Sequence, residues 1–273
     1  MNERQLIATI RDKASFLCVG LDPDPDRMPP HLGTGPDAVL AFNKAIIDAT
    51  ADLAVAYKPN VAFYEALGPD GWDVLSDTLA AIPSDCLRIA DAKRGDIGNT
   101  ATRYARAAFE QWGADAVTVA PYMGRDSVEP FLAFEDKWTI LLAATSNPGA
   151  ADFEFHGAEG GQPLWHRVFE VSRTYEGAER LMYVVGATRP DWLAECRAAA
   201  PDRFLLVPGV GAQGGTLASV CDAGWAEDLA GGLLVNVGRS LLYASAETDF
   251  AAAARREALA IQQAMAVVLA SDR

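Results

Sequence analysis

The sequence has few cysteines and histidines, and neither residue type is spaced to hold a metal ion. Its four cysteines are Cys18, Cys86, Cys196 and Cys221; they include no Cys-x-x-Cys pair, and three lie in or beside apolar runs. We therefore expect buried free thiols in a reducing compartment rather than disulfides. The three histidines show no metal-ligand spacing with one another or with a cysteine, which argues against a zinc site.

Positive charge and long apolar runs are also scarce. The chain has 23 Lys and Arg against 37 Asp and Glu, a formal net charge of −14, which argues against a nucleic-acid or anionic-membrane partner. A small anionic substrate is compatible with this charge, because a pocket can be locally positive. No apolar run approaches the roughly 20 residues that cross a bilayer. Residues 1–13 lack the apolar core of a secretory signal, so we expect a cytoplasmic protein.

The abundant hydrophobic residues, and the way they are spaced, predict a single α/β domain over residues 1–273. Half of the 273 residues are hydrophobic, and short apolar runs typical of parallel strands alternate with amphipathic stretches. Eight such strands predict a (β/α)8 TIM barrel, with an open doubly wound sheet as the alternative. The predicted strands are Phe16–Leu21, Leu53–Lys58, Leu87–Asp91, Ala116–Ala120, Thr139–Ala143, Leu181–Gly186, Phe204–Pro208 and Leu233–Val237.

Two segments stand outside this regular alternation. Residues 1–13 are predicted to form an N-terminal helix. The insertion Ser146–Pro163 contains six glycines or prolines and few apolar residues. It follows the fifth predicted strand, so it is either a surface loop or a mobile cover over a site at the mouth of the barrel.

Ionisable residues gather where the first three predicted strands end. They are Asp22 after the first strand, Lys58 at the end of the second, and Asp91, Lys93 and Asp96 at or after the end of the third. Side chains two apart on an extended strand point the same way, so Asp91 and Lys93 are expected to share a face. In a barrel, that face opens into the mouth, where reacting groups are placed.

These charges have two interpretations. Ion pairs at the rim of a barrel are common and contribute little to stability. The alternating sign favours a functional array instead, because partly desolvated groups of opposite sign keep a lysine charged and carboxylates ionised.

The segment Asp91-Ala92-Lys93-Arg94-Gly95-Asp96-Ile97-Gly98-Asn99-Thr100 resembles the signature of the orotidine 5′-phosphate decarboxylase family. Related barrel decarboxylases acting on sugar phosphates share Asp-x-Lys-x-x-Asp, but the inner Arg-Gly and the following Ile-x-x-Thr are specific to the orotidylate family. The resemblance covers residues 16–243 and is greatest to the bacterial second subfamily. Its other landmarks are Gly20-Leu21-Asp22-Pro23, Tyr57-Lys58-Pro59, Thr145-Ser146-Asn147-Pro148-Gly149, Pro208-Gly209-Val210-Gly211-Ala212-Gln213 and Val237-Gly238-Arg239.

The resemblance implies a decarboxylation that needs no cofactor or metal. The substrate would be orotidine 5′-phosphate, and the product uridine 5′-phosphate. Loss of carbon dioxide from C6 of the pyrimidine leaves a carbanion, which must be stabilised electrostatically and protonated. Lys93 would donate the proton, and Asp91 would lie against the departing carboxylate and orient Lys93.

The resemblance also implies binding roles and a partner. Asp22 and Lys58 would contact the ribose hydroxyls. Asp96, Ile97 and Thr100 would reach into the site of a neighbouring subunit. The implied enzyme is therefore a homodimer with shared active sites, and its catalytic residues at the interface form an alternating network of Lys58, Asp91, Lys93 and Asp96.

Ser146 would contact the pyrimidine, and the loops after strands seven and eight would hold the phosphate. Loops at these positions often bind phosphate in barrels, through backbone N–H groups and helix N-termini. Pro208 and Gly238 lie in these loops, and Arg239 adds a planar bidentate donor. Gln213 either closes over the phosphate or only stands at the start of the following helix.

Two other functions compete with this interpretation. A magnesium-dependent relative would use Asp-x-Lys-x-x-Asp for metal and enolate chemistry, but the inner Arg-Gly and the Ile-x-x-Thr continuation disfavour it. A barrel that binds nucleotides only to sense pyrimidines would need no proton donor, so the intact Asp91/Lys93 pair counts against it.

Overall fold

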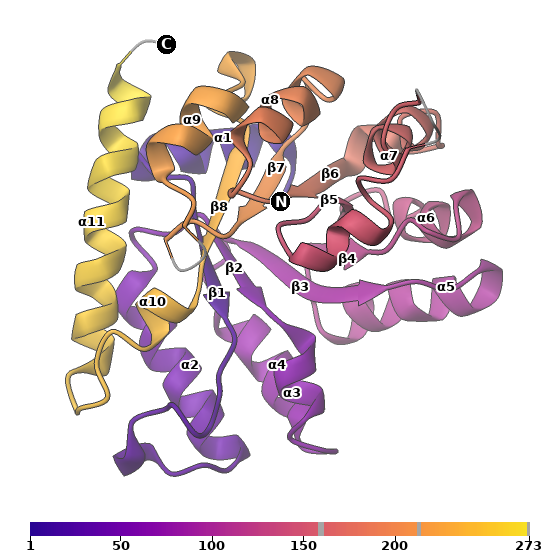
Figure 1. Ribbon diagram of the computed structural model, residues 1–273. Helices are drawn as coiled ribbons and strands as arrows, with labels where there is room; N and C mark the ends of the chain where they lie inside the picture. The colour runs from indigo at the N-terminus through magenta and orange to yellow at the C-terminus, as the bar shows by residue number, and fades with distance from the viewer. Residues whose placement is uncertain (158–160, 212–213, 272–273) are drawn as a thin grey trace. The chain divides into compact units, whose positions relative to one another are not determined.

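The computed structural model describes residues 1–157, 161–211 and 214–271. Its parallel strands form a closed barrel in chain order (Figure 1). The predicted α/β class and (β/α)8 barrel are therefore confirmed, and the open-sheet alternative is wrong. The strands are β1 (Leu17–Leu21), β2 (Ala56–Pro59), β3 (Leu87–Arg94), β4 (Ala116–Val119), β5 (Trp138–Ala144), β6 (Leu181–Val185), β7 (Leu205–Pro208) and β8 (Leu233–Val237).

Helices follow the strands as the amphipathic stretches predict. Among the described residues, no helix is both long enough and apolar enough to cross a bilayer. The helices are α1 (Glu3–Lys13), α2 (Pro36–Thr50), α3 (Val61–Glu65), α4 (Gly71–Ala81), α5 (Gly98–Arg106), α6 (Arg125–Leu132), α7 (Leu164–Ser172), α8 (Pro190–Ala199), α9 (Leu217–Gly224), α10 (Arg239–Leu242) and α11 (Phe250–Ala270).

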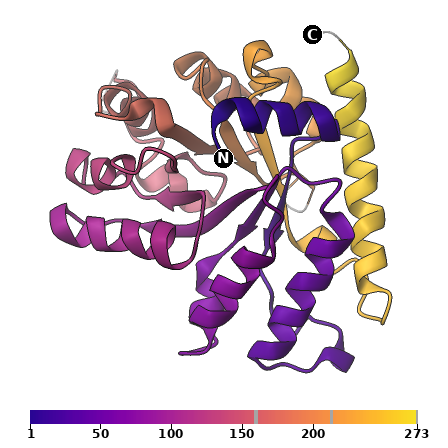
Figure 2. The ribbon, with the colours of Figure 1, turned by 180° about the vertical axis from the view of Figure 1, so that it is seen from behind.

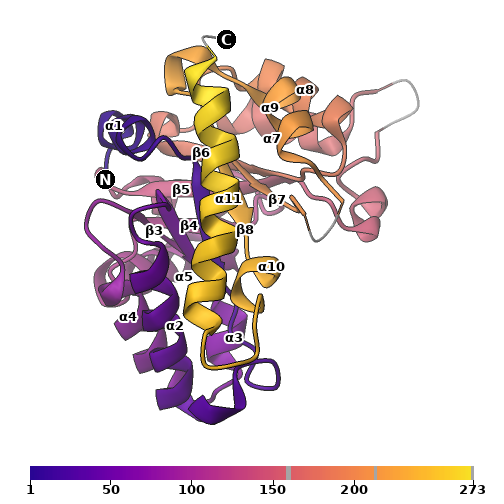
Figure 3. The same ribbon diagram turned by 90° about the vertical axis from the view of Figure 1, so that its left-hand side faces the viewer.

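The chain divides into two compact units, and its description as one domain stays a prediction. The first unit comprises residues 1–92, 107–115 and 236–273, and the second comprises residues 93–106 and 116–235. In the first unit, α11 packs against both α2 and α10, as Figure 3 shows. In the second, α5 packs against α6, and α8 against α9.

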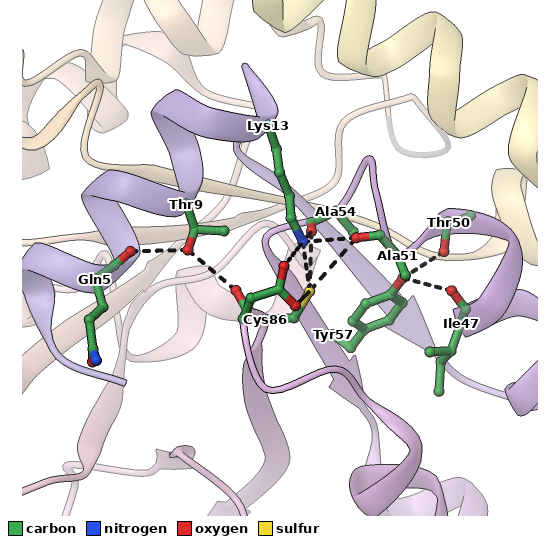
Figure 4. Close-up of polar contacts among 10 residues, drawn as sticks. Gln5, Thr9, Lys13, Ile47, Thr50, Ala51, Ala54, Tyr57 and Cys86 are labelled. Carbon is green, nitrogen blue, oxygen red and sulfur yellow. Dashed lines mark hydrogen bonds and ion pairs between the residues drawn. The ribbon is translucent and has the colours of Figure 1, made fainter.

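Helix α1 is capped at its start and is fixed to the first unit at its end. Asn2 and Gln5 form a capping box at its start. At its end, the ammonium of Lys13 donates to the carbonyls of Ala51 and Ala54 at 2.8 and 3.0 Å (Figure 4). Figure 2 shows α1 beside α11, and the amide of Gln262 on α11 donates to the carbonyl of Lys13 at 3.0 Å.

Lys13 also contacts the two residues just before β3. Its ammonium lies 2.9 Å from a carboxylate oxygen of Asp85 and 3.2 Å from the sulfur of Cys86. Burial acts to lower the pKa of Lys13, but these acidic neighbours outweigh it and raise that pKa. All four cysteines are buried thiols, as the sequence predicted.

The second unit contains a buried cation, Arg197, which is only 7% exposed. The guanidinium of Arg197 on α8 donates to the carbonyls of Gly224 at 2.8 Å and Gly232 at 2.8 Å, and to those of Ala200 and Arg203. Burial lowers the pKa of Arg197 to about 10, so the group stays charged at neutral pH. It thereby pairs with the carbonyls of Gly224, the last residue of α9, and of Ala200, the residue after α8, where helix ends leave carbonyls without intrahelical partners.

Candidate active site

A buried ion pair joins the ends of β2 and β3. The ammonium of Lys58 lies 2.6 Å from a carboxylate oxygen of Asp91, and both side chains are less than a tenth exposed. Lys58 is the register partner of Gly20 on β1, and Asp91 pairs with Asn60. The parallel register therefore brings these two predicted site residues together, although 33 positions separate them in the chain.

The surroundings of Lys58 keep it charged. Burial acts to lower the pKa of Lys58, but the carboxylates of Asp91 and Asp22 outweigh it and raise that pKa above its ordinary value. Cys18 interacts electrostatically with both members of this pair, and burial raises the pKa of its thiol to about 12, so this thiol stays neutral. A lysine held charged by neighbouring carboxylates is the behaviour expected of groups of opposite sign that are partly desolvated.

The loop that carries Asp22 is held by a residue from the other end of the chain. Tyr243 donates its hydroxyl hydrogen to the carbonyl of Asp22 at 2.9 Å and accepts from the backbone N–H of Asp24 at 2.7 Å. The guanidinium of Arg27 lies 4.0 Å from the centre of the tyrosine ring. Because Tyr243 follows α10, it links the loop after β1 to the loop after β8.

The backbone of Lys93 departs from the extended conformation. Its φ of +48° is in the left-handed region, which costs a non-glycine residue about 1–2 kcal/mol. Its N–H donates to the hydroxyl of Thr118 on β4 at 2.9 Å. The prediction that Lys93 shares a face with Asp91 assumed regular strand alternation, and that assumption is wrong at this residue. Strain at a candidate reacting group is common at functional sites.

The residues after Lys93 form an exposed turn into α5. Asp96 accepts the N–H of Ile97 at 2.8 Å, and Ile97 is 54% exposed. Thr100 lies in the first turn of α5 and is also exposed. The apolar Met123, 48% exposed, lies next to Gly95, within 3.6 Å of where a β-carbon on that glycine would lie.

Ser146, the predicted pyrimidine contact, lies two residues after β5. It packs directly against Gly186 at the end of β6, where an added β-carbon would lie 2.7 Å from the Ser146 β-carbon. The N–H of Gly186 donates to the carbonyl of Ala144 at 2.7 Å. Only glycine at position 186 allows the two strand ends to approach this closely.

The predicted phosphate residues lie at the ends of β7 and β8. Pro208 is the last residue of β7, and its carbonyl accepts the N–H of Ala187 at 2.9 Å. Gly238 precedes α10, and Arg239 is the exposed first residue of that helix. Gln213 lies outside the described residues.

Sequence reasoning missed three residues that contact predicted site residues or their direct neighbours. Thr118 receives the Lys93 N–H, Tyr243 anchors the Asp22 loop, and Glu154 binds Thr145 beside Ser146. A polar residue within a buried strand is a signal of such a contact, because buried polar groups are hydrogen-bonded. Thr118 fits this signal, since it is only 1% exposed on β4. For Tyr243 and Glu154, no periodicity in the sequence indicates the contact.

Known proteins resemble this chain over nearly its whole length. Residues 15–256 match the model of the orotidine 5′-phosphate decarboxylase / HUMPS family. The orotidine 5′-phosphate decarboxylase of Flavobacterium johnsoniae is 55% identical, with 99% of each chain covered. That of Bacteroides fragilis is 50% identical, with 97% of each covered. The structure of Leishmania donovani OMP decarboxylase is 38% identical with a TM-score of 0.83, covering 98% of this chain and all of that one.

Proposed function

The chain belongs to the orotidine 5′-phosphate decarboxylase / HUMPS family, and we propose how its own residues perform the reaction. It converts orotidine 5′-phosphate to uridine 5′-phosphate, as expected from the resemblance in its sequence. Identities of 50–55% to orotidine 5′-phosphate decarboxylases disfavour the metal-dependent and sensor alternatives. The buried Lys58–Asp91 pair is the observation that carries the proposed mechanism.

In this mechanism, Asp91 acts while it is ionised and held in place by Lys58. The substrate carboxylate binds beside Asp91, so two negative charges lie close together, and the repulsion is relieved when carbon dioxide leaves. The bond from C6 to the carboxylate carbon breaks, and its electron pair stays on C6. Lys93 then donates a proton from its ammonium to C6 and recovers one from solvent.

The remaining residues bind the rest of the nucleotide. We infer that Asp22 and Lys58 contact the ribose hydroxyls and that Ser146 contacts the pyrimidine. Pro208, Gln213, Gly238 and Arg239 would hold the phosphate. The position of Arg239 two residues after β8 supports this role, because a guanidinium binds phosphate through two parallel hydrogen bonds.

The direct test is turnover without any added cofactor. Purified protein in excess chelator is expected to release carbon dioxide from orotidine 5′-phosphate, because no proposed step uses a metal. Loss of ultraviolet absorbance of the orotate chromophore measures the rate. Activity that vanishes with chelator and returns with magnesium would instead support the metal-dependent alternative.

We also propose that the enzyme is a homodimer in which Asp96, Ile97 and Thr100 complete the partner's site. Exposed apolar side chains near the signature segment support this interface. Ile97 is 54% exposed, Met123 48% and Tyr122 82%. The acidic charge and buried thiols further support a cytoplasmic enzyme with no nucleic-acid or membrane partner.

Mixing two inactive variants tests the shared site. Asp96→Ala and Lys93→Ala subunits are each expected to be nearly inactive alone. After subunit exchange, one site of each hybrid dimer carries neither change, so about a quarter of all sites regain activity. Turnover before and after exchange measures the recovery. If exchange is demonstrated by native mass spectrometry and no activity returns, the sites are not shared.

A further inference from the structure

A carboxylate from the insertion holds the strand end that carries Ser146. Glu154 accepts the backbone N–H of Thr145 at 2.6 Å, and its two oxygens lie 2.9 and 3.0 Å from the Thr145 hydroxyl. Both donors belong to the residue directly before Ser146. Hydrogen bonds to an ionised acceptor are shorter and stronger than neutral ones. This contact therefore fixes the backbone of Thr145, to which Ser146 is joined.

The hydroxyl of Thr145 has a second neighbour, the side-chain oxygen of Asn147 at 2.6 Å. A hydroxyl carries a single hydrogen, so it can donate to only one acceptor at a time. The charged carboxylate is the stronger acceptor. The hydroxyl of Thr145 is therefore assigned to Glu154, so Thr145 is the residue that joins Ser146 to this carboxylate.

Glu154 is itself held on a folded segment. Its carbonyl accepts the N–H of Trp165 on α7 at 3.0 Å. The next residue, Phe155, stacks on Trp192 of α8 with ring centroids 3.6 Å apart. The described part of the insertion is thus anchored to the helices after β5 and β6. Of the two interpretations of Ser146–Pro163, a surface loop or a mobile cover, this anchoring around Glu154 favours the surface loop.

Ser146 is consequently constrained from two sides. Gly186 contacts it from β6, as its absent β-carbon allows, and the Glu154–Thr145 contact restrains it from the insertion. A side chain that must meet a substrate within a few tenths of an ångström needs such support.

We propose that Glu154 is a positioning residue that acts on the substrate through Ser146. This inference rests on the proposed contact between Ser146 and the pyrimidine. Glu154 itself touches no reacting atom in this proposal. Its function is to hold the backbone of Thr145 so that the Ser146 hydroxyl faces the ring.

A double-mutant cycle tests the proposal with orotidine 5′-phosphate as the probe. Glu154→Gln keeps the size of the side chain and removes its charge, and is expected to lower kcat/KM about tenfold, the loss of one charge-assisted hydrogen bond. Ser146→Ala is expected to lower it at least as much. The double variant is expected to be no worse than Ser146→Ala, because residues that act as one unit are not additive.

Asp152→Asn is the matched control, since Asp152 is exposed in the same insertion and loses the same charge. Its kcat/KM is expected to equal that of the wild type. If Glu154 has a purely structural role, Glu154→Gln will lower the melting temperature with or without Ser146→Ala. The two substitutions will then lower kcat/KM by independent factors that multiply in the double variant. Multiplicative effects, or an unchanged kcat/KM in Glu154→Gln, would overturn the proposal. Absent turnover in the wild type would instead overturn the proposed function.

Discussion

Replacing Lys93 by alanine is expected to lower the turnover of orotidine 5′-phosphate by about 10²–10⁴-fold, the contribution of a positioned proton donor. Binding of uridine 5′-phosphate is expected to persist, because the ribose and phosphate contacts are made by other residues. Steady-state assays measure the first quantity and titration calorimetry the second. Lys44→Ala is the control, since Lys44 is exposed on α2.

A second substitution separates proton donation from charge. Lys93→Arg keeps a positive charge, but a guanidinium does not give up its proton at any pH at which proteins remain folded. Turnover is therefore expected to stay as low as in Lys93→Ala. If Lys93→Arg restores most of the activity, the side chain acts by charge alone and the proton comes from another group.

The left-handed backbone of Lys93 adds a stability test. Glycine adopts a φ of +48° without the steric penalty that alanine has. Lys93→Gly is therefore expected to be about 0.5–1 kcal/mol more stable than Lys93→Ala, after the greater freedom of glycine in the unfolded chain is subtracted. Urea unfolding measures the difference. Equal stabilities would mean that the backbone relaxes when the lysine is removed.

The barrel and the strand-end charges could be predicted from the sequence because both depend on local patterns. Continuous apolar runs mark buried parallel strands, and consecutive strand ends meet at one end of a barrel. This reasoning placed Lys58 and Asp91 together, and the structure gives a 2.6 Å ion pair. The predicted second strand, Leu53–Lys58, began three residues before β2 (Ala56–Pro59), because residues 51–53 form a turn.

The contacts that position the site depend on the fold and could not be predicted. Tyr243 lies 221 positions from Asp22, whose loop it anchors. Glu154 reaches back nine positions to Thr145 across an irregular segment for which no periodicity exists. The left-handed backbone of Lys93 could not be predicted, because the alternation of side chains along a strand assumes that every residue is extended. Such local departures are expected where function, rather than stability, selects the conformation.

Removing the ammonium of Lys58 is expected to cost about 3–5 kcal/mol of stability, because it leaves a buried carboxylate without its counter-ion. Lys58→Met keeps the apolar part of the side chain and removes the charge from beside Asp91. Adding Asp91→Asn should recover much of the loss, since no buried charge then remains. Arg167→Met is the control. Its pair with Glu170 is more than half exposed on both sides, and such pairs contribute about 0–1 kcal/mol.

The pH dependence of this difference has a definite sign. The pKa of Lys58 is raised in the folded protein, above the roughly 10.4 of a free lysine. A raised pKa on a base stabilises the fold below the unfolded pKa, and this stabilisation is lost as the pH rises through the folded pKa. The gap in unfolding free energy between wild type and Lys58→Met should therefore stay constant from pH 7 to about 10 and narrow only above that. A gap that closes between pH 7 and about 9 would show that Lys58 loses its proton early, and Asp91 would then lack the permanent counter-ion on which the mechanism depends.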